Sequence, residues 1–293
     1  MNLILTVLEV VAPVFILALI GLIWVRLGHE YSVTFVTKLA MTLSVPCLIF
    51  TALMNTQIEP QALATLTLAS IAAYVAVGVL ALVALWIAGL PLRTYLAPLT
   101  FGNTGNLGLP LALFAFGDIG LDLAVVVFAV MAVFSFTIGV WVVAGGGSIL
   151  KVVKEPMVAA TLLGALFLWQ GWQTPVFLTN TLELIGQLAI PLMLITLGVA
   201  LGRLTPGNLS LNLVLSIAKA AVTAGLAFAI GLWFGLDPVP LAVLTLQVAT
   251  PVAVTSYLLA EKYEADGVAV AGLVVTSTAL SVLYLPLILA FVM

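Results

Sequence analysis

The sequence is poor in charged residues. It contains 8 Lys or Arg and 11 Asp or Glu in 293 residues, so that 6% of the side chains are charged, whereas about 25% are charged in a typical soluble domain. It also lacks a polar stretch long enough to form a second domain. Because 64% of the residues are apolar, most segments of about 20 residues are hydrophobic enough to span a bilayer. The composition excludes an ordinary soluble protein and predicts one polytopic membrane domain.

Cysteine and histidine are nearly absent as well. Cys47 and His29 are each the only residue of their type, which excludes an internal disulfide and a zinc site built from several such ligands. The apolar run around Cys47 favours a small core residue over a reactive thiol. No basic patch is available for nucleic acid, and no nucleophile–base pair or pair of carboxylates lies at mid-bilayer depth. We therefore expect no metal, no cofactor, no nucleic-acid partner and no catalytic residues, and hence no enzyme.

The apolar sequence divides into ten predicted membrane spans. Charged residues and Gly, Pro and Asn clusters mark the divisions, and the first segment lacks the basic region of a signal peptide, so we keep it as a span. The approximate ranges are 3–25, 35–54, 62–89, 94–117, 121–144, 156–172, 179–201, 211–235, 239–260 and 267–292. The most loop-like stretch, 144–155, falls near the midpoint of the chain.

The basic residues predict how the chain is oriented. Lys and Arg beside short loops are retained in the cytoplasm, and the even-numbered loops carry acidic residues but no base. The bases that flank the odd-numbered loops are Arg26, Lys38, Arg93, Lys151, Lys154, Arg203 and Lys262. We therefore predict a multi-pass protein of the cell (inner) membrane with both termini on the external or periplasmic side.

Matches at a constant spacing predict an internal repeat. Three pairs of similar residues in well-separated segments are each 145 positions apart: Trp24 and Trp169, Pro46 and Pro191, Thr100 and Thr245. Two halves of five spans would be inverted relative to each other, because five is odd. The predicted repeats are about 1–145 and about 150–293, within a single transmembrane unit. The paired mid-span prolines are expected to kink their helices.

Two spans at equivalent positions have the composition of interrupted helices. Residues 102–110 read Gly-Asn-Thr-Gly-Asn-Leu-Gly-Leu-Pro, and residues 247–251 read Gln-Val-Ala-Thr-Pro. A second half-helix that begins near the midplane, around 107–108 or 252–253, would direct free N–H groups and the positive end of its dipole at an anion. The alternative is that Gly and Pro only kink these helices. The residues predicted to bind substrate are Asn103, Thr104, Gly105, Asn106, Gly108, Gln247, Thr250 and Pro251, together with Lys219.

Lys219 is the single base inside a predicted span. A charge at that depth is costly and needs a partner, and no carboxylate lies at comparable depth, which leaves carbonyls of span 9, Gln247 or a bound anion. We interpret Lys219 as a counter-charge for an anionic substrate or a stand-in for a coupling cation. A lysine whose long stem lets the ammonium reach a membrane surface is an equally supported alternative.

Four sequence blocks resemble those of bacterial members of the auxin efflux carrier family, a group that includes malonate and malate permeases. The blocks are 11–28, 103–110, 189–198 and 249–263. The resemblance implies an all-α fold of ten helices in two inverted five-helix repeats, with broken helices 4 and 9 crossing at midplane. It also implies a scaffold of helices 1, 2, 6 and 7 and a transport domain of helices 3, 4, 5, 8, 9 and 10. Where the similar bile-acid sodium symporters carry a sodium-binding glutamate, Gln247 lacks the charge, which disfavours sodium coupling.

Three functions remain open from the sequence. The first is a permease that moves small organic anions, such as malonate, malate or auxin-like acids, across the lipid bilayer by alternating access. The second is a sodium- or proton-coupled symporter of a larger amphipathic anion, of the bile-acid type. The third is a membrane sensor or assembly protein that binds without transport. A homodimer is compatible with each of them.

Overall fold

A computed structural model describes residues 3–56, 58–146, 156–204 and 208–292. All regular elements among these residues are helices, and a single isolated β-bridge joins Gly102 to Val252. Helices satisfy their backbone hydrogen bonds within one segment, as a bilayer requires. The predicted polytopic, all-α membrane protein is confirmed at this level. Lys151 and Lys154, two of the bases that predicted the orientation, lie outside the described residues.

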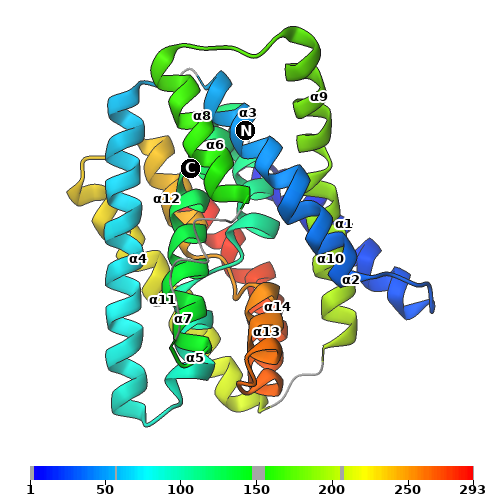
Figure 1. Cartoon of the computed structure of the whole chain (residues 1–293). Helices are drawn as coiled ribbons and strands as arrows, with labels where there is room; N and C mark the ends of the chain where they lie inside the picture. Colours follow the sequence, from blue (N-terminus) through cyan, green and yellow to red (C-terminus); the bar gives the residue numbers. More distant parts are fainter. Residues whose placement is uncertain (1–2, 57, 147–155, 205–207, 293) are drawn as a thin grey trace.

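The helices follow the predicted segments closely (Figure 1). In the first half they are α1 Leu3–Arg26, α2 Val33–Leu39, η1 Ala40–Ser44, α3 Val45–Asn55, α4 Pro60–Ala88, α5 Leu92–Thr100, η2 Thr104–Gly108, α6 Leu109–Phe134, η3 Ser135–Gly139 and α7 Val140–Val143. The three η elements are single π-helical turns. In the second half they are α8 Pro156–Gln170, α9 Val176–Gln187, α10 Ala189–Arg203, α11 Leu209–Trp233, α12 Pro238–Val248, α13 Val254–Lys262 and α14 Gly267–Val292.

Six helical segments of the described chain are long and apolar enough to cross a membrane without interruption. They are Val33–Asn55, Pro60–Ala88, Thr104–Val143, Val176–Arg203, Leu209–Trp233 and Gly267–Val292. The third of these has 40 residues, about twice the length that one crossing needs. Gly117 divides it with φ 65° and ψ −154°, a conformation that only glycine adopts readily. The described chain also contains shorter apolar helices, namely Ala12–Arg26, Ala159–Gln170 and Pro238–Val248.

The helices depart from regular α geometry one turn before each of the two paired prolines. The π turn η1 precedes Pro46, and the division between α9 and α10 at Leu188 precedes Pro191. Proline cannot donate the i→i−4 hydrogen bond, so its helix bends or changes register at the preceding turn. In both halves the departure from regular α geometry therefore lies one turn before the paired proline, where the sequence predicts a kink.

Two groups of helices pack mainly among themselves. In one, α1 lies along α10, and α3 packs on α8 and α9. The contact of α1 with α10 is close because a Cβ at Gly198 or at Gly21 would fall within 2.0 Å of a backbone carbonyl oxygen on the other helix. In the other group, α11 packs on α4, α12 and α14, while α4 packs on α5 and α6.

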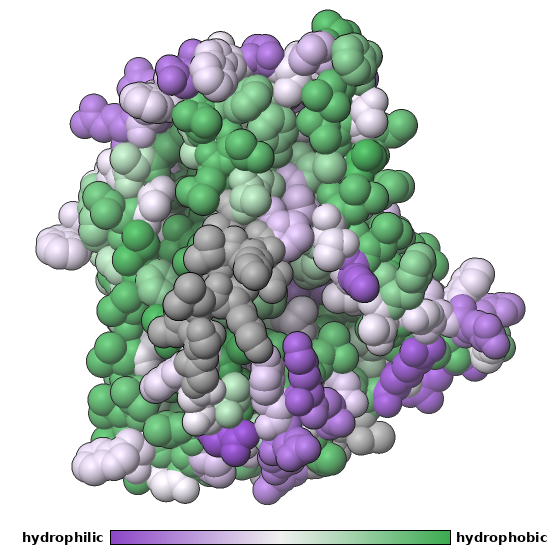
Figure 2. All heavy atoms as spheres, viewed as in Figure 1, coloured by the Kyte–Doolittle hydropathy of each residue, from purple (hydrophilic) through white to green (hydrophobic). Residues whose placement is uncertain are grey.

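The surface has the pattern of a membrane protein. In the view of Figure 2, strongly hydrophilic residues gather along the upper margin, in the lower part and on the projection at the right, and hydrophobic residues cover much of the remaining surface. Trp86, Trp169 and Trp233, each near the end of its helix, are 77%, 79% and 81% exposed. Exposed tryptophans at helix ends are typical of the interface between lipid and water.

Two arginines form hydrogen bonds between the ends of different helices. Arg93 donates from Nε to the carbonyl of Val143 (3.1 Å) and from Nη2 to the carbonyl of Tyr263 (2.9 Å). Arg203 donates to the carbonyl of Tyr31 (2.8 Å). Arg93 therefore joins the start of α5 to the ends of α7 and α13, and Arg203 joins the end of α10 to the connection between α1 and α2.

Candidate functional site

The fourth predicted span is interrupted near its middle. Helix α5 ends at Thr100, Phe101 is extended with φ −103° and ψ 125°, and a new helix begins with the π turn η2 at Thr104. Both Leu107 and Gly108 donate their N–H groups back to the carbonyl of Asn103, at 3.0 and 3.2 Å. The glycine- and asparagine-rich sequence thus produces a true break rather than a kink.

The ninth predicted span is interrupted in the same way. Helix α12 ends at Val248, and α13 begins at Val254 after an extended segment. The Thr250 hydroxyl donates to the carbonyl of Gln247 (2.7 Å), which ends the first half-helix. Pro251 follows directly and could not continue the ladder of helical hydrogen bonds because it has no N–H group.

The two breaks lie against each other. Gly102 and Val252 form an antiparallel bridge, and the N–H of Asn103 donates to the carbonyl of Pro251 (2.7 Å). Gly102 permits this approach, since a Cβ on it would lie 2.2 Å from Thr250 Oγ1 and 2.8 Å from the carbonyl oxygen of Thr250. We refer to residues 101–104 and 249–253 together as the crossing.

Unpartnered polar atoms gather beside the crossing. Gln247 is 0% exposed and Asn103 is 4% exposed. Neither amide atom of the Gln247 side chain, nor Asn103 Nδ2, nor Thr104 Oγ1 has a hydrogen-bond partner among the described residues. Burying such a group without a partner costs about 1–3 kcal/mol by mutational measures. Unfilled donors at this depth indicate a place where a ligand or water supplies the missing bonds.

Other predicted site residues have structural roles at the crossing. Gly108 gives room to Gln247, because a Cβ on Gly108 would fall 2.1 Å from Gln247 Oε1. Gly105 packs on the ring of Phe128, 3.1 Å from where its Cβ would be. Thr250 uses its hydroxyl hydrogen within its own turn, which leaves only its oxygen lone pairs for a ligand. Asn106 is 8% exposed in η2.

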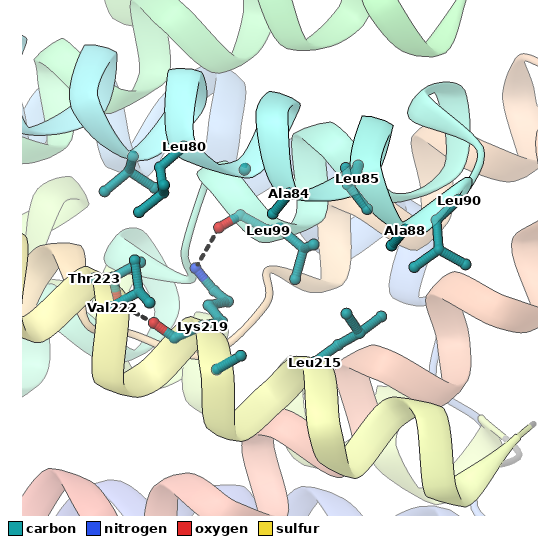
Figure 3. A pocket seen from close by; sticks show the side chains of 13 residues that line it. Leu80, Ala84, Leu85, Ala88, Leu90, Leu99, Leu215, Lys219, Val222 and Thr223 are labelled. Atoms are coloured by element: carbon teal, nitrogen blue, oxygen red, sulfur yellow. Dashed lines mark hydrogen bonds between the residues drawn. The ribbon is translucent and has the colours of Figure 1, made fainter.

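Lys219 points toward the first interrupted helix. Its ammonium donates to the carbonyl of Leu99 (3.3 Å), in the last turn of α5, and only 5% of the residue is exposed (Figure 3). The expected partners were carbonyls of the ninth span, Gln247 or a bound anion, so the partner that the structure provides is a different one. The burial and the bond to α5 also argue against the interpretation that the side chain reaches for a membrane surface.

An apolar cavity of about 200 Å³ adjoins Lys219 between α4, α5 and α11. Apart from Lys219 and Thr223, its lining residues are apolar, and they include Leu80, Leu99 and Val222 (Figure 3). Leu80 and Val222 are 43% and 38% exposed, so the cavity opens toward the face that lipid covers. The ammonium is thus placed in apolar surroundings and directed at a backbone carbonyl.

Helix α14 contributes contacts that sequence reasoning missed. The Ser277 hydroxyl accepts a hydrogen bond from the N–H of Val252 (3.1 Å), and the Tyr284 hydroxyl donates to the carbonyl of Ala249 (3.0 Å). Both partners are backbone groups of the second break. A cluster of small hydroxyl residues in an otherwise apolar helix, Thr276, Ser277, Thr278 and Ser281, was the available signal.

The crossing is buried. The exposed fractions of the side chains beside it, Asn103, Thr104, Asn106, Gln247 and Thr250, are each no more than 8%. A solute could therefore reach these side chains only if the structure around them changed.

Comparison with known proteins gives one family and one relative. The sequence model of a family described as membrane transport protein matches residues 142–289, just over half of the chain. An uncharacterized transporter of Methanocaldococcus jannaschii is 27% identical over 197 residues. The matched region covers 64% of this chain and 64% of the relative, so the chain spans just under two thirds of that protein's length.

Proposed function

The chain belongs to this family of membrane transport proteins, the auxin efflux carrier family, and on that premise we propose that it is a secondary transporter of small organic anions. Carboxylates such as malonate, malate or auxin-like acids are the proposed substrates. Alternating access would carry them across the cell membrane. Membership of a transport family agrees with the prediction from the sequence that the protein is not an enzyme.

The observation that carries the proposal is the set of unfilled donors at the crossing. Asn103 Nδ2 lies in the first break and Gln247 Nε2 in the last turn of α12, directly before the second break, and both atoms are buried without a partner among the described residues. The first N–H groups of η2, on Thr104 to Asn106, have no carbonyl one helical turn before them. A carboxylate accepts several N–H bonds, and the N-terminal end of a helix dipole favours its negative charge. We therefore propose Asn103, Thr104, Asn106 and Gln247 as the groups that bind the carboxylate.

The positive charge of Lys219 also favours an anionic substrate. It is the single buried Lys or Arg side chain among the described residues, and the buried polar groups at the crossing are neutral. In a medium of low dielectric constant, one uncompensated positive charge raises the affinity for an anion over a wide distance. This charge favours an anion over a cation as the transported species.

We further propose ten membrane spans in two inverted repeats. The spans would be α1, α2–α3, α4, α5 to Gly117, the rest of α6 to α7, α8, α9–α10, α11, α12–α13 and α14. The division of the 40-residue segment at Gly117 and the two interrupted helices at equivalent positions support this topology. Both termini would then be external, with the helix ends bonded by Arg93 and Arg203 in the cytoplasm.

The two packing groups support the proposed division into a scaffold and a transport domain. Helices α1, α3, α8, α9 and α10 correspond to spans 1, 2, 6 and 7, the proposed scaffold. The crossing, Lys219 and the capping residues of α14 all belong to the other group, the proposed transport domain. An anion bound at the crossing would therefore move with one group of helices.

A coupled symporter of a larger amphipathic anion is the second candidate. The side chains beside the crossing are each no more than 8% exposed, and this tight enclosure supports a small substrate over a larger one. A sensor or assembly protein without transport is disfavoured by the family to which the chain belongs.

A binding screen followed by flux measurement tests the proposal. Purified protein is first screened by thermal shift against mono- and dicarboxylates, because a ligand at 100 times its Kd stabilises the folded state by about 2.7 kcal/mol. Uptake of the radiolabelled hit into proteoliposomes is then compared for wild type, Asn103→Ala and Asn212→Ala. Asn212 is the matched control, since it is also a buried asparagine with an unpartnered amide but lies in the first turns of α11.

We expect Asn103→Ala to lower uptake about 10-fold to 100-fold, since a hydrogen bond to a charged group contributes about 1.5–3 kcal/mol. Asn212→Ala should remain within about 3-fold of wild type, which corresponds to less than about 1 kcal/mol. Equal uptake by all three proteins would remove Asn103 from the site. Binding of an anion without any flux would contradict the transport function itself.

A further inference from the structure

The carbonyl ends of both interrupted helices are already bonded by donors from other helices. Lys219 of α11 donates to Leu99 O at the end of α5, and Tyr284 of α14 donates to Ala249 O at the end of α12. Free carbonyls at such half-helix ends are the groups that bind a coupling cation in transporters with broken helices. Here the protein itself supplies the positive or polar partner at each end.

Lys219 has the properties of a cation that cannot dissociate. It carries the charge of a monovalent cation, directs it at a carbonyl at the negative end of the α5 dipole, and is held there by its own stem. The neighbouring cavity wall is apolar, so no side-chain oxygen among its lining residues other than Thr223 is available to bind a free ion. The Thr223 hydroxyl donates to the carbonyl of Lys219 itself (2.7 Å).

The described residues offer no alternative site of the usual kind. They contain no group of three or more His, Cys, Asp or Glu side chains that could hold a metal ion. At the crossing, the residues with unfilled hydrogen bonds, Asn103, Thr104 and Gln247, are neutral. A free cation would therefore have to be held there without a carboxylate.

We propose that the Lys219 ammonium takes the place of a dissociable coupling cation, so that anion movement through this protein requires neither Na⁺ nor K⁺. The inference rests on the proposed anion transport and deepens it. In this proposal Lys219 is a positioning residue, because its ammonium bonds the carbonyl of Leu99 at the end of α5, beside the crossing. If the lysine is removed, a small organic ammonium ion such as methylammonium should take its place, because it can donate to Leu99 O and pack its methyl group on the apolar wall.

The first experiment compares cations on the wild-type protein. Proteoliposomes contain and are bathed in equal concentrations of NaCl, KCl or choline chloride, with the labelled anion present only outside. We expect equal initial uptake rates in the three salts, within about 2-fold. An uptake rate that falls 10-fold or more when choline replaces Na⁺ or K⁺ would overturn the inference and leave anion transport itself intact.

The second experiment vacates the site. Lys219→Ala leaves Leu99 O without its partner and enlarges a cavity that already holds about 200 Å³. We expect uptake to fall at least 10-fold in choline and to recover at least 3-fold with methylammonium, which can donate to Leu99 O as the lysine does, but not with Na⁺, which needs several oxygen ligands. Leu215→Ala is the control, because Leu215 lines the same cavity but its loss leaves the lysine in place. Its uptake should not respond to either cation.

Lys219→Met keeps the length of the side chain without its charge and should lose uptake with no recovery in either cation. Thermal unfolding provides a readout that does not require flux: methylammonium should raise the midpoint of Lys219→Ala but not of wild type. If Lys219→Ala transports normally in choline, the inference is wrong. If wild type transports no anion in any salt, the proposed function fails and the cation comparison is not the cause.

Discussion

Gly102 is the residue where the crossing should be most sensitive to a single methyl group. In Gly102→Ala the new Cβ would lie 2.2 Å from Thr250 Oγ1, 2.8 Å from the carbonyl oxygen of Thr250 and 3.3 Å from its carbonyl carbon. Two of these three atoms belong to the backbone of the other break, so a side-chain rotation cannot relieve the overlap. The two segments of the crossing would have to move apart.

The cost can be worked out from two effects. Overpacking a close contact costs about 1–3 kcal/mol. Moving the two segments apart also lengthens the hydrogen bond from the Asn103 N–H to the carbonyl of Pro251, which is now 2.7 Å. One such bond contributes about 1 kcal/mol to stability. We expect Gly102→Ala to lower the stability of the folded protein by about 2–4 kcal/mol and to reduce anion uptake.

Gly78→Ala is the matched control. Gly78 lies in α4, and its Cβ would meet Thr100 Cγ2 at 3.5 Å, an ordinary contact. In the interior of a helix, alanine is preferred over glycine by about 1 kcal/mol, so this variant should be as stable as wild type or more stable. Both variants are purified in the same detergent and followed by thermal unfolding and by uptake in proteoliposomes. If Gly102→Ala unfolds at the wild-type midpoint and transports normally, the two breaks do not meet as described.

Three further substitutions address other parts of the molecule. Gln247→Leu removes two buried amide atoms that have no partner among the described residues. We therefore expect thermal unfolding to show a protein that is more stable by about 1–3 kcal/mol, with strongly reduced uptake. Lower stability would mean that the amide is hydrogen-bonded in the folded protein. Arg93→Ala removes hydrogen bonds to the carbonyls of Val143 and Tyr263 and should lower stability by about 1–3 kcal/mol. Lys38→Ala, at an exposed position of α2, is the control and should leave stability unchanged. Equal midpoints of thermal unfolding for the two variants would contradict the role of Arg93. Tyr284→Phe leaves the carbonyl of Ala249 without its hydroxyl donor and should cost about 1–3 kcal/mol, a loss that unchanged thermal unfolding would exclude.

The positions of the helix breaks were predictable because their cause is local. Glycine, asparagine and proline disfavour the helix through their own backbone and side chains. Residues 102–110 and 247–251 were expected to interrupt their spans, and the structure interrupts them at 101–103 and 249–253. Gly117 likewise separates two predicted spans within one long helical run.

The exact start of each second half-helix was less predictable. The expected starts were near 107–108 and 252–253, whereas η2 begins at Thr104 and α13 at Val254. Pro110 explains part of the first difference: it cannot donate to the carbonyl of Asn106, so the helix begins with a π turn and reaches α geometry only at Leu109. A choice between π and α registers depends on packing around the turn, which composition does not reveal.

The partners of the buried polar groups were the least predictable feature. Lys219 bonds Leu99 O, and a backbone carbonyl carries no residue-type signature. Tyr284 and Ser277 lie 35 and 25 residues from the backbone groups that they bond. Only the packing of α11 and α14 against the breaks brings these groups together.

The site lies entirely within one packing group, and this constrains how it could open. Its polar groups come from η2, α11, α12 and α14, while α1 and α10 are held together by a glycine-mediated contact that a single Cβ would disrupt. The two groups meet where η2 touches α10, where α1 touches α6 and α14, and where α6 touches α3 and α8. Opening the crossing by moving α5 away from α12 would break the bond between Asn103 and Pro251 and destroy the site. Sliding the whole group past its neighbours would leave every bond within the crossing intact, so under the proposed anion transport we expect the crossing to open by movement between the groups.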